Sequence, residues 1–258
     1  MNYEYSNVEK EGKLWIITLN RPERMNALHS PAHFELEEIF NNFSADPDAW
    51  VAIITGSGDR AFCAGNDLRY QAEGGKMERN PSGFAGLTSR FDLKKPVIAA
   101  VNGVAMGGGF EIALACDLII ASENARFALP EPKVGLAALA GGMHRLPRQI
   151  GMKRAMGMML TGRTVEAKEG LSLGFVNEVV DHEELMKSSK KWAESIMECS
   201  PTSVRTTKDV AMAGLDHASI ENAMEQKYDS IIGLFNGEDF VEGPLAFSEK
   251  RKPKWTGK

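Results

Sequence analysis

The stretch VIAAVNGVAMGGGFEIALAC (97–116) constrains the fold more than any other part of the chain. An apolar run from Val97 to Val101 precedes a turn at Asn102-Gly103, three consecutive glycines and an apolar, helix-like segment. This pattern predicts a buried strand, a glycine-rich turn and the start of a helix. Backbone N–H groups at such a junction face outward without side chains over them, so they can hold an anion or a developing oxyanion.

Two glutamates accompany turns of this kind. Glu111 follows the three glycines, and Glu131 lies between two prolines in LPEPKVG, twenty residues further on. A carboxylate beside free N–H groups places an acid/base group next to a polarised carbonyl. A second strand-to-loop-to-helix junction, GSGDRAFCAGNDLRY, offers more free N–H groups at Gly65-Asn66-Asp67. Our hypothesis is that the glutamates and these N–H groups form one site.

The composition argues against several classes of protein. The chain has 258 residues, of which 43% are hydrophobic and 25% charged, and fits one large or two modest globular domains. Its net charge of −5 argues against nucleic acid as the main partner, because that partner requires a basic face. No stretch of eighteen apolar residues occurs, so we expect no membrane span. The polar N-terminus resembles neither a signal peptide nor an Arg-rich transit peptide.

The cysteines and histidines suggest no metal chemistry. Cys63, Cys116 and Cys199 lie far apart without a C-x-x-C pair, which predicts neither a disulfide framework nor a zinc site. A reducing, cytoplasmic compartment is therefore expected. Cys63 is expected to be a small buried hydrophobe. His29 and His33 are expected to be exposed residues of a surface helix and not metal ligands.

Apolar periodicity predicts an α/β core followed by a helical last quarter. Strands are expected at 3–10 and 13–19 (a hairpin with a turn at Glu11-Gly12), 51–55, 97–101, 117–122, 125–129 and 175–180. Helices are expected at 31–44 with Ser30 as N-cap, in most of the chain after residue 140, and at 182–198, 201–213, 216–235 and 238–249. Residues 71–90 are expected to be mobile and to form a pocket wall or lid. The basic tail 251–258 is expected to be frayed.

Six motifs, in this order and spacing, resemble the enoyl-CoA hydratase (crotonase) family over nearly the whole chain. They are RPERMNAL, AFCAGNDL, KPVIAAVNGVAMGGGFEIALACD, ARFALPEPKVG, GGMHRLPR and LTGR. The resemblance implies a spiral of ββα units over 1–197 and a C-terminal helical trimerisation region over 198–258. It also implies a homotrimer or homohexamer. GFAGLT, EGPLAF and EKRKPKW further resemble the carnitinyl-CoA dehydratase-like branch of the family.

The resemblance assigns roles to the residues of the proposed site. The backbone N–H groups of Asn66 and Gly108 would form an oxyanion hole for the thioester carbonyl of an acyl-CoA. Glu111 would activate water and Glu131 would donate a proton to C2, with reversed roles in dehydration. Two carboxylates near one water raise each other's proton affinity, so one can stay protonated near neutral pH.

The resemblance also implies contacts with coenzyme A, which is part of the substrate and not a separate cofactor. Contacts within the subunit would come from Arg24, Ala27, Ala64, Asp67 and Leu68. Phe247 and Lys250 would reach the coenzyme A of a neighbouring subunit, since Lys and Arg suit nucleotide phosphates.

The expected function is reversible addition of water to a trans-2-enoyl-CoA, which belongs to fatty acid metabolism. Three alternatives remain: a carnitinyl-CoA dehydratase, a double-bond isomerase that uses Glu131 alone, and a non-enzymatic acyl-CoA-binding protein. The chain departs from the family at GLAALAGG (135–142), where family hydratases often have a Pro-Gly pair before the next helix. We expect the N–H of Leu139 to help hold the water there, above a different pocket floor.

Overall fold

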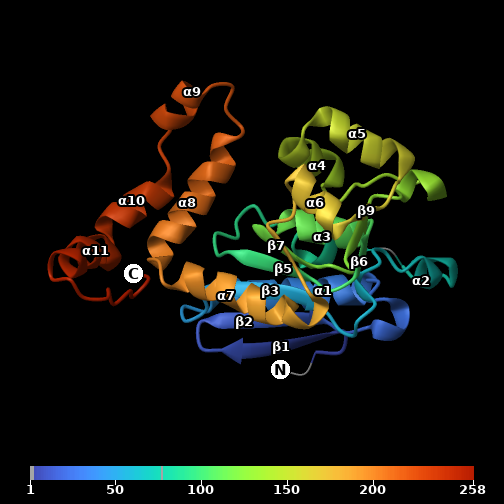
Figure 1. The fold of residues 1–258 in the computed structure, drawn as a ribbon, viewed down its shortest axis with the longest axis horizontal. Helices are drawn as coiled ribbons and strands as arrows, with labels where there is room; N and C mark the ends of the chain where they lie inside the picture. Colours follow the sequence, from blue (N-terminus) through green and yellow to red (C-terminus); the bar gives the residue numbers. More distant parts are fainter. Residues whose placement is uncertain (1–2, 77) are drawn as a thin grey trace.

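The computed structural model describes residues 3–76 and 78–258. In this part of the chain, two β-sheets form the centre and helices cover them (Figure 1). The larger sheet has the order β1-β2-β3-β5-β7-β10. Its strands are β1 (Ser6–Glu11), β2 (Leu14–Leu19), β3 (Val51–Gly56), β5 (Val97–Val101), β7 (Leu118–Ser122) and β10 (Glu178–Val180). The smaller sheet has the order β4-β6-β8-β9, with strands β4 (Ala61–Cys63), β6 (Val104–Met106), β8 (Arg126–Ala128) and β9 (Val165–Glu166).

The chain alternates between the two sheets in a repeating unit. β3 is followed by β4 and helix α2 (Leu68–Ala72), β5 by β6 and helix α3 (Gly108–Ala115), and β7 by β8 and later helix α4 (Gly142–Ile150). The first strands of the units are parallel neighbours in the larger sheet, and the second strands are parallel neighbours in the smaller one. This is the spiral of ββα units that the resemblance implied.

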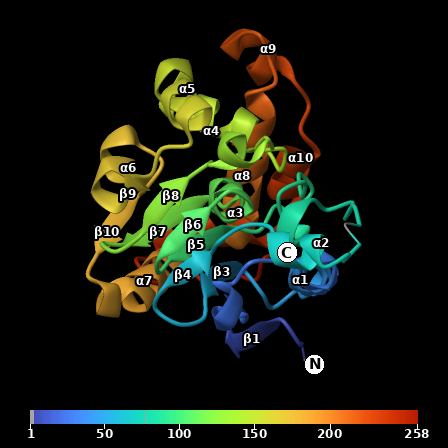
Figure 2. The ribbon, with the colours of Figure 1, turned by 90° about the vertical axis from the view of Figure 1, so that its right-hand side faces the viewer.

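The parallel pairing of the second strands determines where the loops meet. Cys63 pairs with Ala105 and Met106 with Ala128, so the carboxyl ends of β4, β6 and β8 lie at one edge of the smaller sheet. Figure 2 shows these strands side by side, with α3 packed beside β6. The residues that follow each strand, 64–67, 107–111 and 129–131, are therefore brought to the same edge.

The sequence did not predict β4 and β6, the second strands of the first two units, whereas β8 lies within the strand expected at 125–129. β4 and β6 have three residues each and β9 has two, which is too short for an alternation pattern to identify. The longer strands were found. In β5, Ile98 and Ala100 pack in the core under helix α7 (Leu185–Met197), whereas Val97, Ala99 and Val101 pack in the core on the other face. A strand that is buried on both faces explains its uninterrupted apolar sequence.

The remaining helices lie around the sheets and at the C-terminal end. They are α1 (Ser30–Ala45), α5 (Met152–Thr161), α6 (Ala167–Leu173), α8 (Pro201–Gly214), α9 (Ile220–Glu225), α10 (Asp229–Asn236) and α11 (Glu238–Ser248). Short 3-10 turns occur at η1 (Pro22–Arg24), η2 (Phe84–Gly86), η3 (Glu131–Val134) and η4 (His182–Glu184). Helices α8 to α11 extend away from the sheets (Figure 1). In the described residues no helix is long and apolar enough to cross a membrane.

Several expected helix boundaries were wrong. The helix predicted at 216–235 is two helices, α9 and α10, and Ser219 caps the first by accepting a hydrogen bond from the N–H of Asn222. Ser30 is the first residue of α1 and not its N-cap. Its hydroxyl donates to the Lys76 carbonyl (2.7 Å) and accepts from the Glu78 N–H (2.9 Å), which ties α1 to the following loop.

The C-terminal tail is also ordered, contrary to expectation. The buried carboxylate of Asp239 accepts from the backbone N–H of Thr256 (2.8 Å). The indole N–H of Trp255 donates to the Glu198 carbonyl (2.8 Å). Residues 251–258 therefore fold back onto α7 and α11, because their polar groups find partners there that the sequence pattern did not reveal.

Candidate active site

Two glycine loops pack against each other at the edge of the smaller sheet. A Cβ atom at Gly109 would lie 1.9 Å from the Cys63 carbonyl oxygen, and a Cβ at Gly65 would lie 2.7 Å from the Met106 carbonyl oxygen. No side chain fits at these distances, so the loops can approach only through glycine. The contact brings the backbone after β4 next to the N-terminus of α3.

The N–H groups of Asn66 and Gly108 are free in the described part of the chain. Leu28 pairs with the strand-like segment at 65–67 by donating to the Gly65 carbonyl and accepting from the Asp67 N–H, both at 2.8 Å. Successive N–H groups of an extended segment point to opposite sides, so that of Asn66 points away from Leu28. The N–H of Gly108 is an unpaired donor of the first helical turn.

Gly107 sets the direction of the Gly108 N–H. Its φ of +53° and ψ of −125° lie in a region that residues other than glycine avoid. The N–H of Gly107 donates to the Ala128 carbonyl (2.9 Å), which fixes the turn to β8. The first turn of α3 thus presents free donors, where the positive end of the helix dipole also favours negative charge.

Glu111 lies one turn into α3 and is buried, with 3% of its surface exposed. Its Oε1 atom accepts a hydrogen bond from the Gly142 N–H (2.8 Å). Burial, together with a smaller effect from the charge of Glu131, raises the pKa of this carboxyl to about 7. The N–H groups of Gly142 and Ala140 and the charge of Arg145 oppose the increase. Glu111 can therefore change protonation state near neutral pH.

Glu131 begins the 3-10 turn after β8 and is half-buried. Its Oε1 atom lies 3.2 Å from the position that a Cβ of Gly107 would occupy, so the carboxyl group lies over the glycine turn. Its Oε2 atom is buried and has no hydrogen-bond partner in the described residues. Burial raises the pKa of Glu131, which favours the protonated, proton-donating form.

The structure places these four predicted residues on the three loops that meet at one edge. Asn66 follows β4, Gly108 and Glu111 follow β6, and Glu131 follows β8. The charge of Glu131 contributes to the raised pKa of Glu111, which also indicates that the two carboxyl groups are close. The edge thus combines two free N–H donors with two carboxyl groups on neighbouring loops.

The expected role of Leu139 was wrong. Its N–H donates to the Ala137 carbonyl (2.8 Å) and its side chain is exposed. The loop 135–142 instead contributes the N–H of Gly142 to Glu111. A close approach makes this possible, since a Cβ at Gly142 would lie 3.1 Å from Cγ of Glu111.

The coenzyme A contacts expected within the subunit lie around the same loops. The Ala64 N–H donates to the Met25 carbonyl (3.0 Å), which joins the segment that contains Arg24 and Ala27 to the segment that contains Ala64 and Leu68. Leu68 is exposed at the start of α2.

Asp67 is buried and has its own partners. It accepts from the Tyr70 N–H (3.1 Å) as the N-cap of α2, and it pairs with the Arg21 guanidinium (2.9 Å). Both interactions lower its pKa against the effect of burial. Arg21 is the first residue of the motif RPERMNAL, but the sequence did not single it out as a site residue, because nothing local predicts its pairing with Asp67.

Phe247 and Lys250 lie far from this site within one chain. They belong to the end of α11 and the residues after it, at the opposite end of the molecule from α2 (Figure 1). Phe247 is 88% exposed. The chain therefore does not bring these two residues to its own loops.

The burial of His29 and His33 differs from expectation, whereas that of Cys63 agrees with it. His29 and His33 are buried and not exposed, because η2 and the N-terminal segment cover the start of α1. Cys63 is fully buried, as predicted, and burial raises the pKa of its thiol to about 12. The described residues contain no cluster of three or more His, Cys, Asp or Glu suited to a metal ion.

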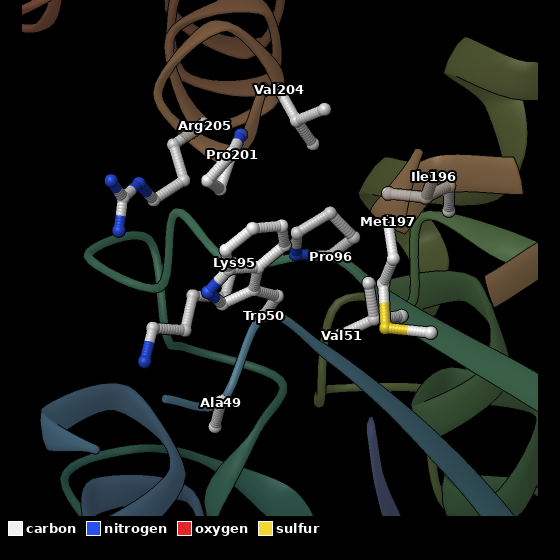
Figure 3. A pocket seen from close by; sticks show the side chains of 10 residues that line it. All are labelled: Ala49, Trp50, Val51, Lys95, Pro96, Ile196, Met197, Pro201, Val204 and Arg205. Atoms are coloured by element: carbon white, nitrogen blue, oxygen red, sulfur yellow. The ribbon is translucent and has the colours of Figure 1, made fainter. Parts of the chain in front are cut away.

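A separate pocket lies away from the carboxylates, where the start of β3 meets α7 and α8 (Figure 3). Its lining is Ala49, Trp50, Val51, Lys95, Pro96, Ile196, Met197, Pro201, Val204 and Arg205. It lies at the junction between the sheets and the C-terminal helices and contains no residue of the candidate site.

Comparisons with known proteins agree with this arrangement. A family model described as enoyl-CoA hydratase/isomerase matches residues 9–258. A carnitinyl-CoA dehydratase from Citrobacter koseri is 43% identical over 257 residues, which cover 96% of this chain and 97% of that protein. The same enzyme from Proteus mirabilis is 44% identical, with 96% of each chain covered. A crystal structure of an enoyl-CoA hydratase from Mycobacterium tuberculosis superposes with a TM-score of 0.92 at 35% identity, covering 98% of this chain and 99% of that one.

Proposed function

The chain belongs to the enoyl-CoA hydratase/isomerase family, and we propose that it adds water reversibly across the 2,3 double bond of a trans-2-enoyl-CoA to give a 3-hydroxyacyl-CoA. Its relatives and structural neighbours make it a hydro-lyase of the enoyl-CoA hydratase type. The substrate is an acyl-CoA thioester, so coenzyme A enters and leaves with it. The observation that carries the proposal is the pair of carboxyl groups, that of Glu111 buried and that of Glu131 half-buried, on the loops that present the two free N–H groups.

The proposed oxyanion hole consists of the N–H groups of Asn66 and Gly108. Bound to the thioester oxygen, they would stabilise the enolate-like charge that develops when hydroxide adds to C3. One donor of this kind contributes about 3 kcal/mol to transition-state stabilisation. Preorganisation supports this role, because glycine contacts on both loops fix the two donors before substrate binds.

The proposed proton transfers use the two glutamates in different states. Ionised Glu111 removes a proton from water as its oxygen bonds to C3, and protonated Glu131 gives its proton to C2. The hydrogen bond from Gly142 stabilises the ionised form of Glu111, and the unpartnered Oε2 of Glu131 suits a proton donor. A base with a pKa of about 7 is well matched to neutral pH. The reverse transfers dehydrate the 3-hydroxyacyl-CoA.

Turnover measurements test this proposal directly. Loss of enoyl-thioester absorbance with crotonyl-CoA should be observed for the native protein, and Glu111→Ala and Glu131→Ala should each abolish most of it. Full activity in both variants would refute the assignment. Tight binding of coenzyme A without turnover of any enoyl-CoA would instead favour a non-enzymatic binding protein.

The relatives support a second substrate, carnitinyl-CoA, because they are named for its dehydration and cover nearly the whole chain. A panel of short, long, branched and carnitine-derived substrates would rank these candidates by kcat/KM. An isomerase that needs Glu131 alone predicts a different result: Glu111→Gln would still move the double bond of a 3-enoyl-CoA.

We also propose that residues 198–258 assemble the chain into a homotrimer or homohexamer, with 1–197 as the catalytic core. Exposed apolar side chains on the C-terminal helices support an interface: Met212, Leu215, Ile220, Met224, Ile232, Phe235, Val241, Leu245 and Phe247. Such a patch is unfavourable in water unless it is covered. Assembly would carry Phe247 and Lys250 to the coenzyme A of a neighbouring subunit.

The three free thiols support a reducing, cytoplasmic compartment.

A further inference from the structure

The segment 83–88 is held from two sides, although the sequence predicted a mobile excursion there. The Phe84 N–H donates to the Thr88 hydroxyl (2.9 Å), which closes the turn. Arg145 of α4 donates to the Thr88 carbonyl (2.8 Å). From the other side, a Cβ at Gly86 would lie 2.3 Å from the backbone nitrogen of Glu37 in α1. The turn is therefore a fixed wall and not a loose lid.

This wall presents an aromatic ring to the proposed oxyanion hole. A Cβ at Gly108 would lie 2.5 Å from the ζ-carbon of Phe84, so the ring packs directly on the glycine that carries the free N–H. An apolar ring beside the donor keeps water away from it. Water exclusion strengthens the hydrogen bond to a developing negative charge.

His33 of α1 holds this ring in place. It is buried, and its Nδ1 atom accepts a hydrogen bond from the Ala85 N–H (3.0 Å). Its ring centroid lies 4.4 Å from that of Phe84 at an angle of 58°. Asn80 donates to the His33 carbonyl (3.0 Å), which adds a second connection between α1 and this segment.

The hydrogen bond from Ala85 stabilises an unfavourable backbone. Ala85 has φ of +56° and ψ of +23°, the left-handed conformation that costs a residue with a side chain about 1 kcal/mol or more. The buried Ala85 N–H has His33 as its partner, so loss of that acceptor leaves the donor unsatisfied in the core. The turn would then relax and the Phe84 ring would leave Gly108.

We propose that His33 is a positioning residue of the active site, which acts through Ala85 and Phe84 to keep the aromatic ring packed on Gly108, the residue that carries the free N–H. This inference rests on the proposed function of Gly108 as an oxyanion donor. His33 is not proposed as a proton carrier: with Nδ1 accepting from Ala85, the neutral ring holds its own proton on Nε2. Burial also lowers its pKa to about 4, which keeps the ring neutral at neutral pH.

Three variants test the chain of contacts. His33→Leu removes the acceptor, His33→Asn keeps an acceptor oxygen near the position of Nδ1, and Phe84→Leu removes the ring. The matched control is His182→Leu, in η4, where the ring nitrogen Nδ1 is hydrogen-bonded to the Ser122 hydroxyl (3.2 Å) outside the proposed site. We expect His33→Leu and Phe84→Leu to lower kcat about tenfold or more with little change in KM. His33→Asn should recover most of the loss, and the control should match the native protein.

A second measurement does not depend on turnover. Butyryl-CoA labelled with ¹³C at the thioester carbonyl cannot be hydrated, and its C=O stretch moves to lower frequency when the oxygen accepts strong hydrogen bonds. The downshift should be smaller in His33→Leu and Phe84→Leu than in the native protein and His33→Asn. If the downshift is as large in His33→Leu and Phe84→Leu as in the native protein, the proposal is overturned. This result can be obtained even if the native protein hydrates no enoyl-CoA, so it is independent of the proposed function.

Two further outcomes decide against a positioning role. If His33→Leu lowers only the Tm and leaves kcat unchanged, the residue is merely structural. If His33→Asn shifts the pH dependence of kcat/KM, the residue takes part in proton transfer. Should His33→Leu fail to fold, Phe84→Leu and His33→Asn still give the comparison of kcat and carbonyl frequency.

Discussion

Glu111→Gln should inactivate the enzyme and stabilise its fold above neutral pH. Gln has nearly the shape of a protonated Glu, so it represents the neutral form of this side chain without its ability to ionise. The native carboxyl group is buried, and burial raises its pKa to about 7 from 4.5. In the proposed mechanism, ionised Glu111 is therefore a catalytic group that lowers the stability of the fold.

The magnitude follows from proton linkage. The folded state binds the proton more tightly than the unfolded chain, so the stabilisation is present below pH 4.5 and is lost as pH rises to about 7. At about 1.4 kcal/mol for each tenfold difference in proton affinity, the total loss is about 3 kcal/mol. Glu111→Gln cannot ionise and avoids this loss. It should exceed the native protein by about 3 kcal/mol at pH 8 and by about 1 kcal/mol at pH 5.

Urea unfolding at the two pH values, at one fixed protein concentration, measures this difference. Glu194→Gln, at an exposed position of α7, is the matched control and should show no comparable gain. Hydration by Glu111→Gln should fall by a factor of about 10² to 10⁴. A variant that is no more stable than the native protein at pH 8, or a stability difference that does not depend on pH, would refute the reasoning.

The other predictions concern the same loops and the tail. Gly108→Ala should lower kcat about tenfold or more, because its Cβ would collide with the Phe84 ring. The control Gly157→Ala, which has open space around it in α5, should leave kcat unchanged and stabilise the helix by about 0.5–1 kcal/mol. Steady-state kinetics and thermal unfolding of both variants check this prediction. The kcat/KM of hydration should rise with pH through about 7 as Glu111 ionises, and a flat profile between pH 6 and 8 contradicts its role as base. Asp239→Ala should lower the free energy of unfolding by about 2–4 kcal/mol, since it removes a buried carboxylate that accepts hydrogen bonds from Ser200, Thr202 and Thr256. Urea unfolding measures this loss, and limited proteolysis should show a newly cleavable tail.

The sequence suggested the main residues of the proposed site because their motifs are local. The glycine turn before Glu111 and the two prolines around Glu131 can be read directly from the chain, and the structure brings both carboxyl groups to the same edge. The length of a strand limited the reading elsewhere. Three-residue strands such as β4 and β6 carry too little pattern to be recognised, yet their parallel pairing is what brings the loops together.

Residues that act through distant partners were misread. His33 has the surroundings of an ordinary helix residue in the sequence, but the turn at 84–86 covers it and uses its Nδ1 as an acceptor. The tail after residue 250 carries the charge of a frayed end, but Asp239 and Glu242 hold it. In each case the deciding partner lies far along the chain, where periodicity and capping rules give no information.

The sequence by itself determined which segments are buried strands, where glycine must form the turns and which two carboxylates follow them, because backbone conformation and burial depend on local residue types. Only the tertiary structure decided that Gly142 supplies the N–H to Glu111, that Leu139 does not hold the water, and that Phe84 packs on Gly108. The hydrogen bond from Gly142 joins α3 to a loop 31 residues later, and the hydrogen bond from Ala85 to His33 joins α1 to a turn 52 residues later. They arise from the packing of the two sheets and their helices, which no local pattern encodes.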